Sequence, residues 1–201
     1  MEQENKQDET EKGSSDNVVV AKKKMKKEFE LPEGVSISYD KGVLTVMKDK
    51  KESKKNIDMS GFDFKVEGNK VIIEAYDSNK IVKKLLGSIM AHIKNMSRGV
   101  VEGHKYVLKI CSGHFPMNVS LEGNKLSIKN YLGEKIPRVL EIKEGASVKV
   151  ENENIVVESI SKEIAGQVSA DIEQISKRVG FDSRVFQDGI YIIEKDGKVL
   201  K

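Results

Sequence analysis

The sequence has a single cysteine, no tryptophan and only 5% aromatic residues. Because Cys111 has no partner in the chain, an internal disulfide is excluded, and the protein is not built for an oxidising compartment. No apolar run exceeds five residues, which is too short to span a membrane. The N-terminus is acidic and polar, unlike a secretory signal. These absences predict a cytoplasmic protein that has no membrane partner.

Recognisable catalytic motifs are also missing. The sequence has no glycine-rich phosphate loop and no zinc-protease motif, and nothing in it indicates a small-molecule substrate or a cofactor. Cys111 and His114 have the spacing of half a zinc site, but structural zinc needs four ligands and the chain has no second cysteine. The sequence therefore favours a protein that is not an enzyme and that binds no metal.

Charged residues are plentiful but nearly balanced. Lysine and arginine total 35 against 32 aspartate and glutamate, which gives a formal net charge of +3. Six acidic and two basic residues give the first twenty positions a charge of −4, so the rest of the chain carries +7. A mildly basic folded part suits a polyanionic partner such as a nucleic acid, although many ordinary solvated surfaces have the same balance.

The N-terminal segment has too little apolar surface to fold. Residues 1–24 are mostly polar and acidic, and they end in a run of lysines that continues to Lys27. Such a segment cannot bury enough apolar area to offset the entropy of ordering, so we expect residues 1–24 to be a disordered extension. The lysine run fits a solvated tether and a phosphate-contacting arm equally well.

Short segments of strand character follow the extension. Residues 35–39 and 43–46 alternate apolar and polar side chains on either side of a glycine-containing turn, which predicts a β-hairpin. Residues 64–66 and 71–73 predict a second hairpin of the same kind.

Two helices are predicted, because apolar residues recur at steps of three and four in two separate stretches. Asp77 or Ser78 can cap the start of the first helix, and Gly99 can end it. Gly180 is the expected stop of the second helix. The apolar stripes are Val82, Leu85, Leu86, Ile89, Ile93, Met96 and Val100 in the first helix, and Ile164, Val168, Ile172, Ile175 and Val179 in the second.

The pattern of the chain repeats at a spacing of 84 residues. Pro32 and the strand that follows it recur as Pro116 with a similar strand. The tripeptide Lys65–Glu67 recurs at 149–151, again before a hairpin. The two helices also share a sequence pattern, at the smaller spacing of 79 residues. Three coincidences in the same order indicate a duplicated unit.

The repeat predicts an α+β protein of two tandem duplicated domains, each an antiparallel sheet with one packed helix. In such a unit the helix and the sheet bury their apolar faces against one another. We expect the domains to cover residues 25–103 and 104–195, with a C-terminal tail at 196–201. A strand at 106–110 should open the second domain, and His104 should lie in the loop between the domains.

Three parts of the sequence resemble one protein family. They are Ala91–Val100 in the first helix, His114–Val119 together with Lys129–Lys135, and Arg184–Ile192 near the C-terminus. The chain is similar over about residues 25–195 to the universal ribosomal protein L-six family of the large subunit, in its archaeal and eukaryotic form. The most specific positions of the resemblance are Arg184, Phe186, Asp188, Gly189 and Tyr191.

The resemblance implies a structural constituent of the large ribosomal subunit that binds ribosomal RNA and has no enzymatic activity. Members of the family lie near the sarcin–ricin loop and the base of the stalk, where translational GTPases dock, beside neighbouring ribosomal proteins. They bind RNA mainly through the second domain. The main alternative is a module of duplicated units that binds other proteins and no RNA.

The candidate RNA-binding residues are cations and polar side chains of the second domain. Lysine and arginine contact phosphates, while histidine, asparagine and tyrosine can reach ribose hydroxyls or bases. Lys177 and Arg178 are also explained without RNA, because cations favour the end of a helix. Phe186 and Tyr191 are expected to pack in the protein rather than to stack on bases. The candidates are Lys109, His114, Lys129, Asn130, Tyr131, Lys135, Arg138, Lys177, Arg178 and Arg184.

The segment between Met47 and Lys55 departs from the family, whose first domain has a glycine-containing loop at this place. Here lysines predominate from Lys48 to Lys55, and we expect a basic loop. Its charge density suggests an auxiliary contact with phosphates, and a solvated face is the alternative.

Overall fold

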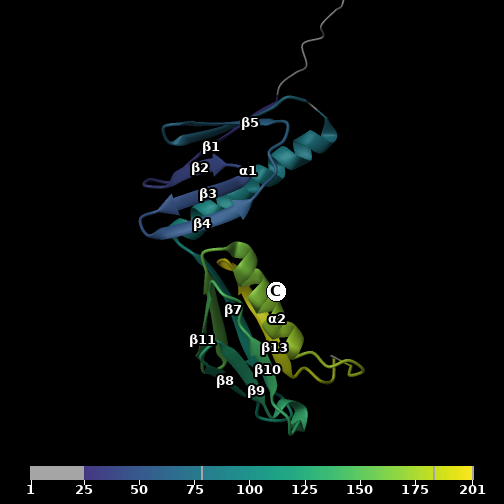
Figure 1. The fold of residues 1–201 in the computed structure, drawn as a ribbon. Helices are drawn as coiled ribbons and strands as arrows, with labels where there is room; N and C mark the ends of the chain where they lie inside the picture. The colour runs from purple at the N-terminus through teal and green to yellow at the C-terminus, as the bar shows by residue number, and fades with distance from the viewer. Residues whose placement is uncertain (1–24, 78, 183, 201) are drawn as a thin grey trace, which may run out of the picture.

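The computed structural model consists of two units, and the chain passes from the first unit to the second at the end of the first helix (Figure 1). The described residues are 25–77, 79–182 and 184–200. The expected disordered extension, residues 1–24, and the candidate helix cap Ser78 lie outside these ranges. The predicted α+β fold of two sheet-plus-helix units is confirmed, with the strands of each unit divided between two antiparallel sheets. Neither helix of the described chain is long and apolar enough to cross a membrane.

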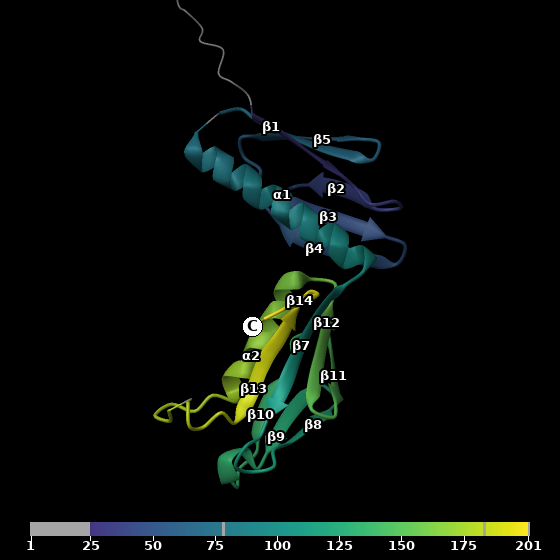
Figure 2. The ribbon, with the colours of Figure 1, turned by 180° about the vertical axis from the view of Figure 1, so that it is seen from behind.

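The first unit is built from two three-stranded sheets and one helix that lies across them (Figure 2). The strand orders are β1-β6-β5 and β2-β3-β4, and all pairs are antiparallel. Both predicted hairpins are confirmed as β2–β3 and β5–β6. The elements are β1 (Met25–Glu30), β2 (Ser36–Asp40), β3 (Val43–Lys48), β4 (Lys51–Asn56), β5 (Phe62–Glu67), β6 (Lys70–Ala75) and α1 (Lys80–Val101).

The second unit repeats this plan and adds strands at the C-terminus. Its sheets have the orders β11-β12-β7-β13-β14 and β10-β9-β8. The elements are β7 (His104–Cys111), β8 (Asn118–Glu122), β9 (Lys125–Lys129), the short 3-10 helix η1 (Tyr131–Gly133), β10 (Arg138–Glu141), β11 (Ala146–Glu151), β12 (Asn154–Ser159), α2 (Lys162–Ile175), β13 (Gly189–Lys195) and β14 (Lys198–Val199).

The duplication read from the sequence is present in the topology. Strands β5 and β6 begin at residues 62 and 70, and β11 and β12 begin at residues 146 and 154, which reproduces the spacing of 84. The order β1-β6-β5 recurs as β7-β12-β11. The second unit differs because β13 pairs with the free edge of β7. The C-terminal motif therefore lies at a place that has no counterpart in the first unit.

Each unit has its own hydrophobic core. In the first core, the apolar stripe of α1 packs on both sheets, and Leu44 and Ile93 are fully buried. In the second core, α2 packs on the five-stranded sheet, and Leu108 and Ile172 are fully buried. Complete burial of one such side chain contributes about 1.5–3 kcal/mol to folding. The predicted stripes are largely confirmed; Leu85 is an exception, because half of its surface is exposed.

The end of α1 differs from the prediction. Gly99 does not stop the helix, which continues to Val101 and is followed by Gly103 in the left-handed conformation at φ 81°. A Cβ atom at Gly99 would lie only 2.0 Å from the carbonyl oxygen of Ile160. The missing side chain of Gly99 therefore allows the backbones of the two units to approach closely, and Gly103 makes the turn that ends the helix.

The expected basic loop is a strand for most of its length. Lys51–Asn56 forms β4, which pairs with the whole of β3 through a turn whose Asp49 has φ 52°. The lysine-rich sequence hides this strand, because only Ser53 of β4 is buried and apolar alternation is absent. Lys26 and Lys27, at the end of the basic run, likewise belong to a strand, β1, rather than to a free arm.

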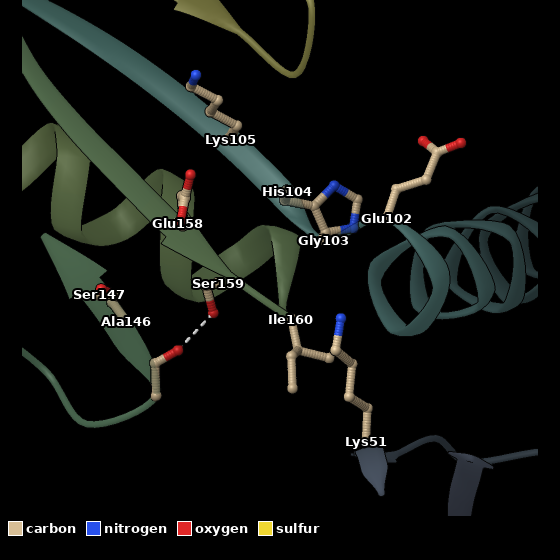
Figure 3. A pocket seen from close by; sticks show the side chains of 11 residues that line it. Lys51, Glu102, Gly103, His104, Lys105, Ala146, Ser147, Glu158, Ser159 and Ile160 are labelled. Carbon is tan, nitrogen blue, oxygen red and sulfur yellow. Dashed lines mark hydrogen bonds between the residues drawn. The ribbon is translucent and has the colours of Figure 1, made fainter. Parts of the chain in front are cut away.

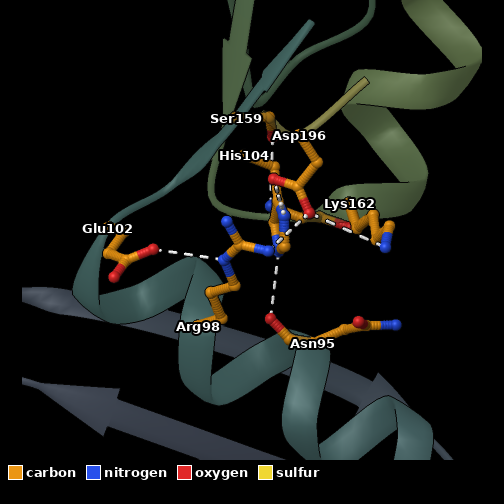
Figure 4. A network of polar contacts seen from close by, with 8 residues as sticks. Asn95, Arg98, Glu102, His104, Ser159, Lys162 and Asp196 are labelled. Atoms are coloured by element: carbon orange, nitrogen blue, oxygen red, sulfur yellow. Dashed lines mark hydrogen bonds and ion pairs between the residues drawn. The ribbon is translucent and has the colours of Figure 1, made fainter. Parts of the chain in front are cut away.

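A polar network joins the two units where the chain crosses from α1 to β7 (Figure 4). The side chain of His104, the first residue of β7, is fully buried, with Nδ1 3.0 Å from a carboxylate oxygen of Asp196 and Nε2 3.0 Å from the carbonyl oxygen of Asn95. Arg98 and Lys162 also approach Asp196, at 3.3 and 3.7 Å. The expected tail thus contributes Asp196 to the junction.

A second set of contacts lies beside this network. Lys55 of β4 forms an ion pair with Glu163 of α2 and contacts Nδ1 of His92 at 3.2 Å. A cavity of about 500 Å³ separates the units nearby, and Figure 3 shows Lys51 extending toward Ile160 across it. Its lining mixes lysine with glutamate and backbone, so the cavity has no predominant charge.

Candidate nucleic-acid interface

The connection between β9 and β10 and the segment between α2 and β13, which carry most of the predicted RNA-binding residues, lie at the end of the second unit that faces away from the first (Figure 1). There the connection between β9 and β10 lies near the segment that joins α2 to β13, in both Figures 1 and 2. His114 comes from the turn after β7, and Lys109 lies within β7, opposite Tyr191 of β13. The fold therefore brings together residues that lie up to 75 positions apart in sequence, such as Asp188 and Gly113.

Arg138 contacts several neighbouring residues at one end of this surface. Its guanidinium lies 4.2 Å from the centroid of the Tyr131 ring and donates to both carboxylate oxygens of Glu134, at 2.7 and 2.8 Å. It also donates to the backbone carbonyls of Ile175 and Lys177, at 2.6 and 3.1 Å. The hydrogen bond from Arg138 holds the pKa of Glu134 below its ordinary value. Arg138 thus ties the turn after β9 to the end of α2.

These bonds explain why α2 ends before the predicted stop. The helix ends at Ile175, and Val179 is almost completely exposed rather than part of the apolar stripe. The carbonyls of Ile175 and Lys177 accept hydrogen bonds from Arg138. The hydroxyl of Ser176 accepts a hydrogen bond from the amide of Ile190 at 2.9 Å. Because these tertiary bonds replace intrahelical ones, the chain can leave the helix early.

Asp188 organises the turn that carries His114. This buried carboxylate accepts from the amides of Gly113 and His114, at 2.6 and 3.0 Å, and from Nδ1 of His114 at 2.5 Å. Burial raises the pKa of Asp188, but the hydrogen bonds from His114 and Gly113 outweigh this effect, and the pKa lies below its ordinary value. In the sequence, Asp188 is marked only as a position of the family resemblance, and no local pattern indicates this anchoring role.

Aromatic rings continue the surface from His114. The ring of Phe186 lies between His114, at 5.2 Å between centroids, and Phe181, at 4.8 Å in an edge-on contact. The guanidinium of Arg178 lies 4.4 Å from the centroid of Phe181. Phe186 is half-buried here and packs on these neighbouring rings, outside the hydrophobic core of the second unit. Phe181 was missed because a lone ring in an irregular segment produces no periodicity.

The remaining candidates differ in how free their side chains are. Tyr131 is buried at 3% exposure, which gives it a supporting position beneath Arg138. Asn130 has a left-handed backbone, and its amide donates to the carbonyl of Pro116 at 3.0 Å. Arg184 pairs with Asp182 at 3.2 Å. Four of the candidate lysines, Lys109, Lys129, Lys135 and Lys177, are exposed and form no ion pair within the described residues. Contact of any of these residues with RNA stays a prediction.

Metal-ligating side chains do not cluster in the part of the chain that the structure describes. No three histidine, cysteine, aspartate or glutamate residues come together in these ranges. The ring of His114, the histidine of the half zinc site, is bonded to Asp188 through Nδ1.

Comparison with known proteins covers nearly the whole chain. The family model for ribosomal protein L6 matches residues 115–189. The large ribosomal subunit protein uL6 of Methanococcus vannielii is 42% identical over 176 residues, which is 88% of this chain and 97% of the relative. The uL6 proteins of Methanosarcina mazei and Saccharolobus solfataricus are 41% and 39% identical over 173 residues, which is 86% of this chain and 98% and 96% of theirs. Since the likeness includes both units, the chain belongs to the ribosomal protein L6 family.

Proposed function

We propose that the chain is a structural component of the cytoplasmic large ribosomal subunit and that it binds ribosomal RNA through the far end of its second unit. Family membership supports a place in the large subunit, because the relatives are large-subunit proteins. The resemblance further supports a position near the sarcin–ricin loop and the base of the stalk, with ribosomal proteins as neighbours. The proposed role is structural and involves no catalysis.

The observation that carries the proposal is a group of exposed cations on rigid turns. Lys129 ends strand β9, Lys135 follows Glu134, and the carbonyl of Lys177 accepts from Arg138; none of the three lysines has a carboxylate partner within the described ranges. Cations that are not paired within the protein remain available to phosphates, and a rigid backbone lowers the entropic cost of positioning them. Such contacts release counterions from RNA, so binding weakens as the salt concentration rises.

Four alanine substitutions test this surface. The variant removes Lys129, Lys135, Lys177 and Arg178, and its affinity for large-subunit ribosomal RNA is measured by co-sedimentation over a series of salt concentrations. Each lost phosphate contact should reduce the slope of log affinity against log salt by about 0.7–0.9, so the loss of all four contacts should reduce it by about 2.8–3.6.

A matched control removes four lysines from the outer face of α1, at Lys80, Lys83, Lys84 and Lys94, all of which are exposed. Its slope should stay close to that of the unaltered protein. Equal effects of the two variants would show that net charge alone drives binding. If the unaltered protein washed off the RNA at moderate salt but remained with another protein, the chain would be a protein-binding module instead.

A further inference from the structure

A cavity of about 310 Å³ opens beside the proposed RNA-binding surface. It lies between η1, the segment after α2 and the start of β13. Small-ligand sites range from roughly 300 to 1,000 Å³, so this cavity has room for a single compact group. Its lining includes the rings of Tyr131, Phe181, Phe186 and Tyr191 and the cationic residues Lys177 and Arg178.

The aromatic wall of the cavity is already ordered. Phe186 packs between the rings of His114 and Phe181. Asp188 holds His114 in place, because it accepts hydrogen bonds from the ring and the amide of His114 and from the amide of the preceding residue, Gly113. Phe181 is 41% exposed, so part of its ring remains free for a further contact. A preformed wall of this kind loses little side-chain entropy when a planar group stacks against it.

The charge around the cavity favours an anion. Lys177 has no ion pair within the described residues, and the guanidinium of Arg178 forms one ion pair among them, with Glu134 at 3.8 Å. The carboxylate in the lining, Asp188, already accepts from His114 and Gly113. A ligand that combines a flat apolar ring with an adjacent negative charge therefore matches both the wall and its charge.

We propose that this cavity binds one unstacked nucleobase of RNA, with the base on the ring of Phe181 and the adjoining phosphate near Lys177 and Arg178. The inference rests on the proposed function and specifies the RNA that the surface recognises: a bulged or looped nucleotide, because a base inside a helix is already stacked on its neighbours through both faces. Stacking of a base on a protein ring changes affinity by roughly 5- to 150-fold, with little dependence on which base it is.

The test uses the full-length protein bound to large-subunit ribosomal RNA. Substitution Phe181→Leu keeps an apolar side chain but removes the aromatic face, and the matched control is Phe115→Leu, because Phe115 is also about half exposed and lies outside the cavity. The affinity of each variant is measured over a range of salt concentrations. In parallel, short-wavelength ultraviolet light crosslinks stacked rings to bases, and mass spectrometry locates the crosslinked peptide and nucleotide.

We expect Phe181→Leu to weaken binding 5-fold or more without changing the salt slope, since stacking releases no counterions. The peptide that contains Phe181 should crosslink to an unpaired nucleotide in the unaltered protein and in Phe115→Leu, and lose this crosslink in Phe181→Leu. Unchanged affinity of Phe181→Leu, or a crosslink from this peptide to a protein neighbour or a paired base, would overturn the inference while salt-dependent RNA binding persisted. Absence of salt-dependent binding by the unaltered protein would instead overturn the proposed function.

Discussion

At the scale of single residues, buried polar groups hold the functional end of the molecule in shape. Asp188 receives three hydrogen bonds from a turn that is 74 or 75 positions away in sequence. Arg138 donates to the carboxylate of Glu134, to the carbonyl of the last residue of α2, Ile175, and to the carbonyl of Lys177 just beyond it. Removal of one partner from such a buried group leaves the others unsatisfied, which costs more than the bond itself contributes.

Substitution Asp188→Asn should lower the free energy of unfolding at neutral pH by about 1–3 kcal/mol, because the bond to the ring of His114 loses its charge. The pKa of Asp188 is lowered in the folded protein, so its ionised form stabilises the fold above the ordinary aspartate pKa near 4. This stabilisation is lost as the pH falls through the lowered value. Urea unfolding at several pH values should therefore show the variant and the unaltered protein converging in acid; a constant difference would contradict the assignment.

Gly99 and Gly87 offer a paired test on one helix. A Cβ at Gly99 would collide with the backbone of Ile160, whereas at Gly87 the nearest atom is the end of the Lys27 side chain at 4.0 Å. Gly87→Ala should stabilise the protein by up to about 1 kcal/mol through helix propensity. Gly99→Ala should destabilise it by about 1–3 kcal/mol through overpacking, as measured by thermal unfolding. Similar melting temperatures for the two variants would mean that the units do not approach as closely as described.

At the scale of secondary-structure elements, the turn between β13 and β14 fastens the second unit to α1. Asp196→Asn should lower stability by about 1–3 kcal/mol, since the nearly buried carboxylate contacts the buried ring of His104 and pairs with Arg98 and Lys162. Asp182→Asn provides the control, because its partner Arg184 is 89% exposed and such surface pairs contribute about 0–1 kcal/mol. Chemical denaturation measures both variants, and hydrogen exchange near Asn95 should rise only in Asp196→Asn.

Strand β4 has lysines with two different roles. Lys55 is engaged with Glu163 at the junction, so its loss should affect stability. Lys50 and Lys51 lie at the exposed turn into β4, where a contact with phosphates is open to them. Replacing both with alanine should reduce the salt slope of RNA binding by about 1–2 if each contacts a phosphate. An unchanged slope would identify this turn as a solvated face.

At the scale of the whole molecule, two separate cores meet through polar contacts and one close backbone approach. Ile93 and Ile172 occupy corresponding places in α1 and α2, and both are fully buried. Truncation of either to alanine should cost about 2–5 kcal/mol. If the predicted domains 25–103 and 104–195 are separate folding units, hydrogen exchange should accelerate mainly in the unit that carries the substitution. Acceleration throughout both units would show a single cooperative unit.

Much of this architecture was predictable because its signals are local. The spacing of apolar residues gave both helices, the two hairpins of the first unit and the duplication, which follow from the side-chain periods of helices and strands. The stretch Arg184–Ile192 pointed to the family. The candidate RNA-binding surface was predicted only in outline. The sequence allowed cations such as Lys129 and Lys177 to be named, but it did not predict how they are arranged in space.

The sequence by itself determined the two sheet-plus-helix units, their order and their family, because these depend on neighbours within a few residues or on a motif. Only the tertiary structure decided where α2 ends, why Gly99 lacks a side chain, that a lysine-rich segment becomes β4, and that Phe181 and Phe186 meet at a cavity. Each of these features depends on atoms that are far apart in the chain and become neighbours only after both cores have packed. A local pattern contains no information about such distant partners.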